Sequence, residues 1–288
     1  CVQLESIEFS NDSKLQTIGK KAFFKSTIKC IKIPSSVTLI GESAFSKCKQ
    51  LQRVEIPNDS KLQTIEKNAF SLSKIESITI PSEFINLKEG WCNATLNITE
   101  IIVSPNNPRY CLYENNLLLG KARIEDNNYD CLVFCNRNIK HIKIPNFIKH
   151  VCSCSFDYCS QLETIEISSE SKLETINKHA FSGTIIKSIT IPSSVKLIGE
   201  GAFSDCKQLE TVEIPNDSKL KKIDEYAFFS TRIKSISIPS SVTLVSDNAF
   251  TDCYQLQIIE FNSTKITMIW NELFYGCNTV LIMIPHYS

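Results

Sequence analysis

The sequence predicts a repeat solenoid built mainly from short parallel β-strands. One strand-like phrase recurs along the chain, usually at steps of 23 or 24 residues. Within each copy, apolar residues alternate with polar ones, as in a strand with one buried side. A single unit of this length is too short to bury its own apolar side, so consecutive units must stack on one another.

The strand phrase is rich in β-branched residues and often ends in proline. In the copy at 51–57, Leu51, Val54 and Ile56 share one side, and Arg53 and Glu55 share the other. We expect about twelve such strands to run parallel, roughly 4.8 Å apart. The copies lie at residues 4–9, 28–34, 51–57, 75–81, 98–103, 139–145, 162–168, 186–192, 209–215, 233–239, 256–261 and 280–285.

The segments between these phrases fall into two alternating types, which together form a super-repeat of 47 residues. Residues 35–50 represent one type and residues 58–74 the other. Both types carry an inward isoleucine followed by an Ala-Phe pair. Each segment is too short for a long helix, so we expect short 3₁₀-like or irregular turns.

One unit is longer than the others and divides the array. We therefore predict a single solenoid with N-terminal repeats at 1–103, an inserted island at 104–138 and C-terminal repeats at 139–288. The island itself reads as a β-hairpin followed by a third strand at 129–135. Two interpretations stay open, a flap that closes one side of the solenoid and an island that binds a ligand.

Three tyrosines of the island are its candidate binding side chains, namely Tyr110, Tyr113 and Tyr129. In the preceding unit, Gly90-Trp91-Cys92 replaces the Ala-Phe pair. We expect Trp91 to fill the core there.

The chain contains 13 cysteines, and their positions argue against a disulfide framework. One group follows the phenylalanine column by three residues, where a small side chain would satisfy buried backbone groups. Most members are two repeats apart, near 10 Å by strand spacing, and a disulfide needs Cα atoms within about 7 Å. This predicted structural column comprises Cys1, Cys48, Cys159, Cys206, Cys253 and Cys277.

The other cysteines leave two questions. Cys111, Cys131 and Cys135 of the island leave one bridge open as an alternative. Cys152 and Cys154 precede Cys159 without the spacing of a zinc pair, so we predict no metal site. Because the first residue, Cys1, already occupies the middle of a unit, we expect the chain to be part of a longer protein.

The outward positions of the strands form the expected concave face. Its candidate ligand-binding residues are Lys32, Arg53, Glu55, His141, Lys143 and Glu166. The alternative is a solvated face on which opposite charges attract across adjacent strands, by about 0.2–1 kcal/mol per pair. Few aromatic residues lie there, so binding through this face alone would be weak or multivalent.

Charge and motif content exclude several function classes. The formal net charge is zero, so no global field draws the chain to nucleic acid or anionic lipid. No apolar run reaches the roughly 20 residues that span a bilayer. None of the common catalytic or phosphate-binding motifs occurs, so we predict no enzyme activity and no cofactor. Six sequons offer glycosylation sites on a secreted protein, at Asn11, Asn58, Asn93, Asn97, Asn216 and Asn262.

The repeat pattern also carries a family resemblance over nearly the whole chain. The phrase from Ile198 through Ala202-Phe203, Cys206 and Leu209 to Pro215 resembles the BspA-like, Treponema pallidum-type leucine-rich repeats. The alternating units are most similar to the BspA-like surface antigens of trichomonad parasites. The resemblance implies a right-handed solenoid with a parallel sheet on one face.

The same resemblance implies a place at the cell surface or outside the cell, and a role in adhesion to host cells or matrix through a protein or glycan ligand. Two alternatives are a structural spacer array and an intracellular protein-interaction module. The ligand and the oligomeric state do not follow from the sequence.

Overall fold

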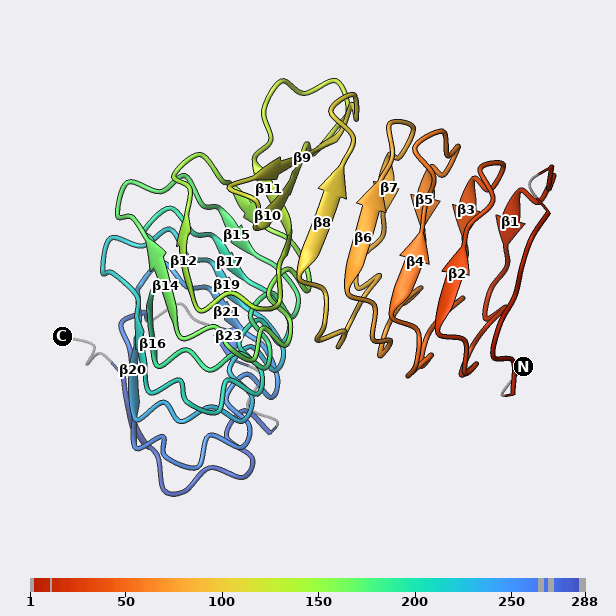
Figure 1. The fold of residues 1–288 in the computed structure, drawn as a ribbon. Coiled ribbons are helices and arrows are strands. Elements are labelled where there is room, and N and C mark those ends of the chain that lie inside the picture. Colours follow the sequence, from red (N-terminus) through yellow and green to blue (C-terminus); the bar gives the residue numbers. More distant parts are fainter. Residues whose placement is uncertain (1–2, 11, 264–266, 269–271, 285–288) are drawn as a thin grey trace. The chain divides into compact units, whose positions relative to one another are not determined.

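A computed structural model describes residues 3–10, 12–263, 267–268 and 272–284 (Figure 1). The predicted sites Cys1 and Asn11 lie outside these described residues, as does Ile269, the inward isoleucine expected from the sequence in the last return segment. The chain divides into two compact units, which we describe separately. Unit 1 comprises Cys1–Tyr129 and Val133–Asn138, and unit 2 comprises Asp130–Leu132 and Ile139–Ser288. The part of the chain that is described contains strands and turns but no helix.

The recurring phrase forms the first of two strand ladders, which confirms the predicted parallel solenoid. Each strand buries alternate side chains and exposes the others, as in the exposed-buried-exposed pattern of Arg53–Glu55. In unit 1 the first ladder consists of β2 (Cys30–Lys32), β4 (Arg53–Glu55), β6 (Ser77–Ile80) and β8 (Glu100–Val103).

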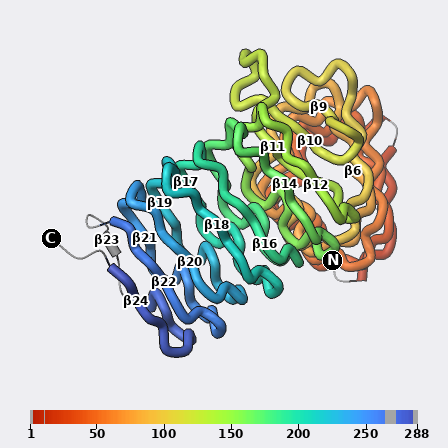
Figure 2. The backbone as a smooth tube through the Cα atoms, turned by 90° about the vertical axis from the view of Figure 1, so that its left-hand side faces the viewer, coloured from red at the N-terminus to blue at the C-terminus, as the bar shows by residue number. Residues whose placement is uncertain are grey.

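Unit 2 carries the same ladder in its repeats, and several of its strands are seen side by side in Figure 2. Its first-ladder strands are β12 (His141–Ile144), β14 (Thr164–Ile167), β16 (Ser188–Thr190), β18 (Thr211–Glu213), β20 (Ser235–Ile238), β22 (Ile258–Phe261) and β24 (Leu281–Met283).

The first ladder is not continuous, which differs from the expected run of about twelve paired strands. Its strands pair two by two, as β2–β4, β6–β8, β12–β14 and β16–β18, and β20–β22–β24 form a group of three. Phrases within a pair start 23 residues apart. A 24-residue step separates one pair from the next, except across the island, where the step is 41 residues, and at β24, which pairs across a 24-residue step. Residues 4–9 form no strand.

A second parallel ladder runs through the return segments, where only turns were expected. Most of its strands contain the inward isoleucine of a repeat, as in the pairing of Ile40 with Ile65, and others have Leu87, Val151 or Val245 at that position. In unit 1 its strands are β1 (Thr17–Ile18), β3 (Leu39–Ile40), β5 (Thr64–Ile65) and β7 (Asn86–Leu87). In unit 2 they are β13 (His150–Val151), β15 (Thr175–Ile176), β17 (Leu197–Ile198), β19 (Lys222–Ile223), β21 (Leu244–Val245) and β23 (Thr267–Met268).

After this second strand, each repeat turns through a segment bounded by two residues with left-handed backbone. In one such turn these residues are Gly201 and Asp205, both with φ of 57°. Alternate amides satisfy the turn itself, as where Ser204 N donates to Gly201 O at 2.9 Å. The others reach the next repeat, as where Phe203 N donates to Ala227 O at 2.8 Å. Half of the hydrogen bonds of the turn therefore depend on a stacked neighbour.

The phenylalanine column fills the centre of the solenoid. In unit 2, the ring of Phe203 is fully buried and stacks between Phe181 at 5.4 Å and Phe228 at 5.5 Å. In unit 1, Trp91 is 4% exposed and meets Phe70 edge to face at 6.2 Å. Trp91 therefore fills the core, as expected for the unit that lacks the Ala-Phe pair.

Three residues after the phenylalanine of each repeat, thiols and hydroxyls alternate from Ser26 to Ser73 and from Cys159 to Cys253. Cys206 is fully buried, and its Sγ donates to Phe181 O, in the preceding repeat, at 3.1 Å. Its sulfur also lies 3.3 Å from Thr184 Oγ1. Cys48 in unit 1 bonds Phe23 O and Ser26 in the same way, at 2.9 and 3.2 Å. The thiol thus donates to the phenylalanine carbonyl of the preceding repeat, as the hydroxyl of Thr95 does to Phe70 O at 2.8 Å.

The inserted island forms an antiparallel hairpin in unit 1. Strand β9 (Tyr110–Tyr113) pairs with β10 (Leu117–Gly120), so that Tyr110 lies opposite Gly120. The turn between them has left-handed backbone at Glu114 and Asn115, as the tightest hairpin turns require. Strand β11 (Cys131–Cys135) follows, and its first two residues belong to unit 2, where they pair with β13.

Removing the ring of Phe203 tests the stacked column. We expect Phe203→Ala to lower the free energy of unfolding by about 3–5 kcal/mol, because it leaves a cavity between two buried rings. Urea unfolding followed by circular dichroism measures this loss. Tyr275→Ala is the matched control, since that ring is 67% exposed, and it should cost less than about 1 kcal/mol. Equal losses in both variants would contradict the stacked-core interpretation.

The buried thiol column predicts a specific dependence of stability on pH. Burial raises the pKa of Cys206 from 9.0 to about 12. Because this pKa is higher in the folded chain than in the unfolded chain, its contribution to stability is full below pH 9 and is lost as pH rises toward 12. Cys206→Thr replaces the thiol with a hydroxyl, the group that Thr184 has at the equivalent position of its own repeat. This variant should therefore lose less stability over this pH window than the wild type.

Urea titrations at about pH 8 and about pH 10.5, on either side of the pKa of the unfolded thiol, measure the difference. Cys30→Thr changes an exposed thiol and serves as the control, which should follow the wild type. A Cys206→Thr variant with the same pH slope as the wild type would show that this thiol does not contribute.

Candidate functional site

The exposed face of the first ladder carries a shallow hollow in each unit. The unit 1 hollow is lined by side chains that include Lys32, Arg53 and Glu55, with Ser77 and Thr79 beside them. The unit 2 hollow is lined by Lys143, Glu166, Ser188 and Thr190, among others. Five of the six side chains proposed from sequence as ligand-binding residues therefore line a hollow.

Strand register places opposite charges across from each other in the unit 1 hollow. Lys32 on β2 lies opposite Glu55 on β4. Glu55 Oε1 also forms an ion pair with Arg53 Nη2 at 2.8 Å. The Arg53 side chain is 71% exposed and the Glu55 side chain is 45% exposed. An ion pair this exposed contributes about 0–1 kcal/mol, so a ligand could replace it at little cost.

The same arrangement recurs in unit 2. Lys143 on β12 lies opposite Glu166 on β14. On the same two strands, His141 Nδ1 is 2.8 Å from Thr164 Oγ1, while Thr190 Oγ1 on the next strand donates to Glu213 Oε2 at 3.0 Å. His141, the sixth candidate, is exposed and neighbours the hollow along its strand. The face presents donors and acceptors in parallel rows.

The island tyrosines do not lie together on one surface. Tyr110 is 4% exposed, and its hydroxyl accepts from Leu87 N at 3.1 Å, so it belongs to the core of unit 1. Tyr113 and Tyr129 are partly exposed. Burial, with a smaller effect from Cys111, raises the pKa of Tyr129, and Lys121 Nζ lies 5.1 Å from its ring centroid. Only these two tyrosines are accessible to a ligand.

Sequence reasoning missed the polar side chains that attach the island to unit 1. Asn107 is 5% exposed, and its amide donates to Pro81 O at 2.6 Å and Phe84 O at 2.9 Å. Arg109 Nη1 donates to Ile85 O at 2.8 Å. These bonds hold the hairpin against the preceding turn, which supports the interpretation of the island as a structural flap.

Arg137, at the end of the island, is a buried cation. It is 2% exposed, its guanidinium lies 4.2 Å from the Phe134 ring centroid, and its Nε donates to Thr95 O at 3.4 Å. An arginine in a loop is ordinarily exposed, so nothing in the local sequence signals this burial.

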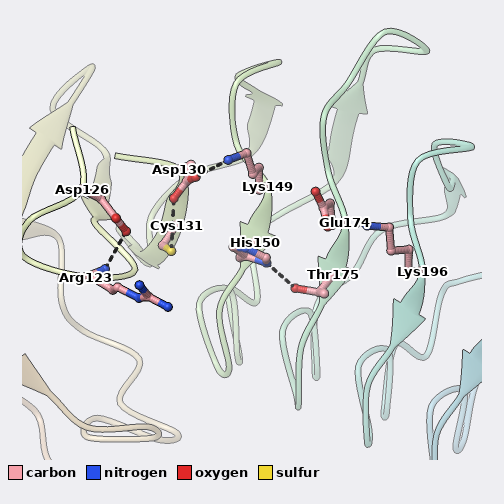
Figure 3. Close-up of polar contacts among 9 residues, drawn as sticks. All are labelled: Arg123, Asp126, Asp130, Cys131, Lys149, His150, Glu174, Thr175 and Lys196. Atoms are coloured by element: carbon pink, nitrogen blue, oxygen red, sulfur yellow. Dashed lines mark hydrogen bonds and ion pairs between the residues drawn. The ribbon is translucent and has the colours of Figure 1, made fainter. Parts of the chain in front are cut away.

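A second polar row lies along the second ladder of unit 2 and was also missed (Figure 3). Lys149 Nζ pairs with Asp130 Oδ2 at 2.9 Å, and Lys196 Nζ pairs with Glu174 Oε2 at 2.6 Å. The hydrogen bond from Lys196 is the main cause that lowers the pKa of Glu174. The signal was present, because the residue before each short strand alternates in sign over these four repeats.

Figure 3 also shows neighbouring contacts that close local turns or link adjacent strands. His150 Nδ1 lies 2.9 Å from Thr175 Oγ1 in unit 2. In unit 1, Arg123 N donates to Asp126 Oδ2 at 2.9 Å. These bonds stabilise the turns and strands in which they lie.

The predicted cysteine column lies inside the solenoid wherever it is described. Cys48, Cys159, Cys206 and Cys253 are fully buried. Cys277 is half-buried, and its Sγ donates to Phe250 O at 3.0 Å. In the island, Cys111 is a free, half-buried thiol. In the described part of the chain, no group of three or more His, Cys, Asp or Glu side chains is arranged to hold a metal ion.

The sequons differ in accessibility. Asn58, Asn97 and Asn216 are exposed, and Asn93 is half-buried. Asn262 is half-buried and donates through Nδ2 to Ser237 Oγ at 2.9 Å. Glycosylation stays a prediction for all of them. Among the residues that the structure describes, no helix has the length and apolar character needed to cross a bilayer.

Several solved bacterial structures are similar in fold to this chain. A leucine-rich cell surface protein of Faecalibacterium prausnitzii matches 93% of this chain with a TM-score of 0.68 and 22% identity, and this chain spans 63% of its length. A leucine-rich repeat protein of Eubacterium ventriosum matches 92% of this chain with a TM-score of 0.70 and 22% identity, and the match covers 81% of that protein's chain. The pneumococcal vaccine antigen PcpA matches 99% of this chain with a TM-score of 0.65 and 19% identity, and the match covers 75% of that antigen's chain.

At these identities the likeness concerns the fold alone. No curated protein sequence matches the chain. The family model described as the BspA type leucine rich repeat region matches in six copies, over residues 1–117, 129–257 and 174–287. That match covers most of the sequence, including both unit types of the array. The chain therefore belongs to the BspA-type leucine-rich repeat family.

Proposed function

We propose that the chain is a non-catalytic binding scaffold that presents its first-ladder face to a protein or glycan ligand. The observation that carries this proposal is the pair of similar hollows on that face. Each is lined by a lysine and a glutamate at matching strand positions, Lys32 with Glu55 and Lys143 with Glu166. A ligand with its own repeated charges would meet the same chemistry in both units.

The energetics of this face favour many weak contacts over one strong contact. The charges are exposed, so each contributes little alone. Aromatic and arginine side chains dominate tight interfaces, and the face offers Arg53 but few rings. Affinity would then come from several repeats, or several copies of the protein, engaging an extended ligand together.

The proposed setting is the cell surface or the extracellular space, and the proposed role is adhesion to host cells or matrix. The similar fold of a bacterial cell surface protein and of a vaccine antigen supports this setting. The exposed sequons at Asn58, Asn97 and Asn216 are compatible with it.

A structural spacer is the second candidate. The observation in its favour is that exposed charges of the first ladder already face opposite charges of the chain itself, as Lys143 faces Glu166. A spacer would need a solvated face of this kind and no ligand. Binding measurements separate the two candidates.

Removing both charges of a hollow tests the binding role. We expect the double variant Lys143→Ala/Glu166→Ala to bind an extracellular-matrix coating roughly fivefold to thirtyfold more weakly, corresponding to a loss of about 1–2 kcal/mol at an interface. Saturation binding of the purified chain, with folding checked by circular dichroism, measures the change.

The control is Lys196→Ala/Glu174→Ala, which removes a lysine and a glutamate of the second ladder and should bind like the wild type. Equal weakening of both variants would assign binding elsewhere. No saturable binding by a folded wild-type chain, to matrix or to cell monolayers, would favour the spacer.

A further inference from the structure

The left-handed turns carry opposite charge in the two units, although the whole chain is neutral. We define the turn face as the six residues in each repeat that begin one residue before the first left-handed position and end at the second. In unit 1 its lysines are Lys20, Lys21, Lys25, Lys47 and Lys67, and its acidic residues are Glu42 and Glu89. In unit 2 its exposed or half-buried acidic residues are Glu200, Asp205, Glu225, Asp247, Asp252 and Glu272, and its lysine is Lys178. Glu200 pairs with Lys178 at 2.7 Å and Asp205 with Lys207 at 3.8 Å, and the other four carboxylates form no ion pair found among the described residues.

The lysines of unit 1 converge on one aromatic ring. The ammonium groups of Lys21, Lys25 and Lys47 lie 5.7, 5.3 and 5.9 Å from the centroid of Phe24. All three side chains are exposed. Of the ion pairs found among the described residues, none involves these three lysines.

An acidic residue of the same turn face, Glu42, is already engaged in an ion pair. Glu42 pairs with Lys20 at 2.7 Å. The hydrogen bond from Lys20 is the main cause that lowers the pKa of Glu42, and the charges of Lys21 and Lys67 add to it. The turn face of unit 1 therefore keeps an excess of positive charge, held in place over a ring.

The turn face of unit 2 combines carboxylates with exposed tyrosines. Tyr158 and Tyr226 are each 39% exposed and Tyr275 is 67% exposed. Glu225 and Glu272 are exposed beside them. Ammonium groups are attracted to the faces of tyrosine rings as well as to carboxylates, and tyrosine is among the residues that dominate interfaces. This surface fits a partner that presents closely spaced lysines.

We propose that the lysine turn face of unit 1 docks on the acidic, tyrosine-bearing turn face of unit 2 in a second copy of this chain. The two faces occupy the same place in the repeat. Both rows of charge therefore advance by one stacked turn, about 4.8 Å, from one repeat to the next. A net charge of zero removes long-range repulsion between copies, so local complementarity can orient their encounter.

The second copy explains both faces with one contact, whereas a linear polyanion would explain only the lysines. Because each copy carries both faces, the association either closes into a dimer or continues into a chain of copies. Either product fulfils the proposal.

Sedimentation of the purified chain at two salt concentrations tests it. Screening lengths are about 30 Å at 0.01 M salt and about 3 Å at 1 M salt. We expect the wild type to self-associate at the lower salt and to be a monomer at the higher. The variant Lys21→Glu/Lys25→Glu/Lys47→Glu and the variant Asp205→Lys/Glu225→Lys/Asp252→Lys should each self-associate at least about tenfold more weakly, because like charges then face each other.

Mixing the two variants gives the decisive measurement, because the reversed faces are complementary to one another. The mixture should recover low-salt association, which also requires both variants to be folded. Lys14→Glu/Lys61→Glu/Lys74→Glu changes the charge of unit 1 by the same amount away from the turn face, and should associate like the wild type.

Three results would overturn the proposal. One is a monomeric wild type at low salt, and another is a mixture that stays monomeric although circular dichroism shows both variants folded. The third is equal loss of association in the control variant. Retention of a monomeric wild type on a column of sulfated polysaccharide would instead assign the lysines to a polyanion.

Discussion

The stacking of each turn on the next is the constraint on which the rest of the structure depends. Alternate amides of the left-handed turn, such as Phe203 N, find their acceptors only in the following repeat. A buried amide without an acceptor costs about 1–3 kcal/mol, and each left-handed residue other than glycine costs about 1–2 kcal/mol more. One turn alone therefore has no stable form. The phenylalanine of a turn is stacked on both faces only when a repeat lies on each side of it, as Phe203 is between Phe181 and Phe228.

This constraint explains why the irregular repeats keep the core contacts of a regular repeat although their sequence and length differ. Where the Ala-Phe pair is missing, the ring of Trp91 packs against Phe70 on one side and against Phe134 on the other, and its centroid lies 5.5 Å from that of Phe134. Where residues are inserted, Asn107 supplies the backbone of the preceding turn with hydrogen bonds. The insertion can thus be large, provided that its first and last residues rebuild the contacts that a regular turn would make.

Much of this fold could be predicted from the sequence, because each buried column repeats once per unit and strand alternation assigns every side chain to a face. The same alternation placed Lys32, Arg53 and Glu55 together on the exposed face. The second ladder was missed because strands of two residues, such as Leu39–Ile40, are too short to show alternation. Tyr110 was misjudged because hairpin register, and not the repeat, decides which of its sides is buried. The opposed charges of the turn faces were hidden because the formal charge of the whole chain is zero.

The alternation of thiol and hydroxyl beside the phenylalanine column has a consequence for how such a protein changes length. Cys206 lies against Thr184, and Cys253 lies against Thr231. Duplication or loss of a 47-residue segment preserves these unlike neighbours, whereas gain or loss of one unit would bring like groups together, as at Cys253 and Cys277. Selection acting on packing alone would therefore favour gene variants whose repeat number differs by two, so that the pair of units is the heritable building block of the array.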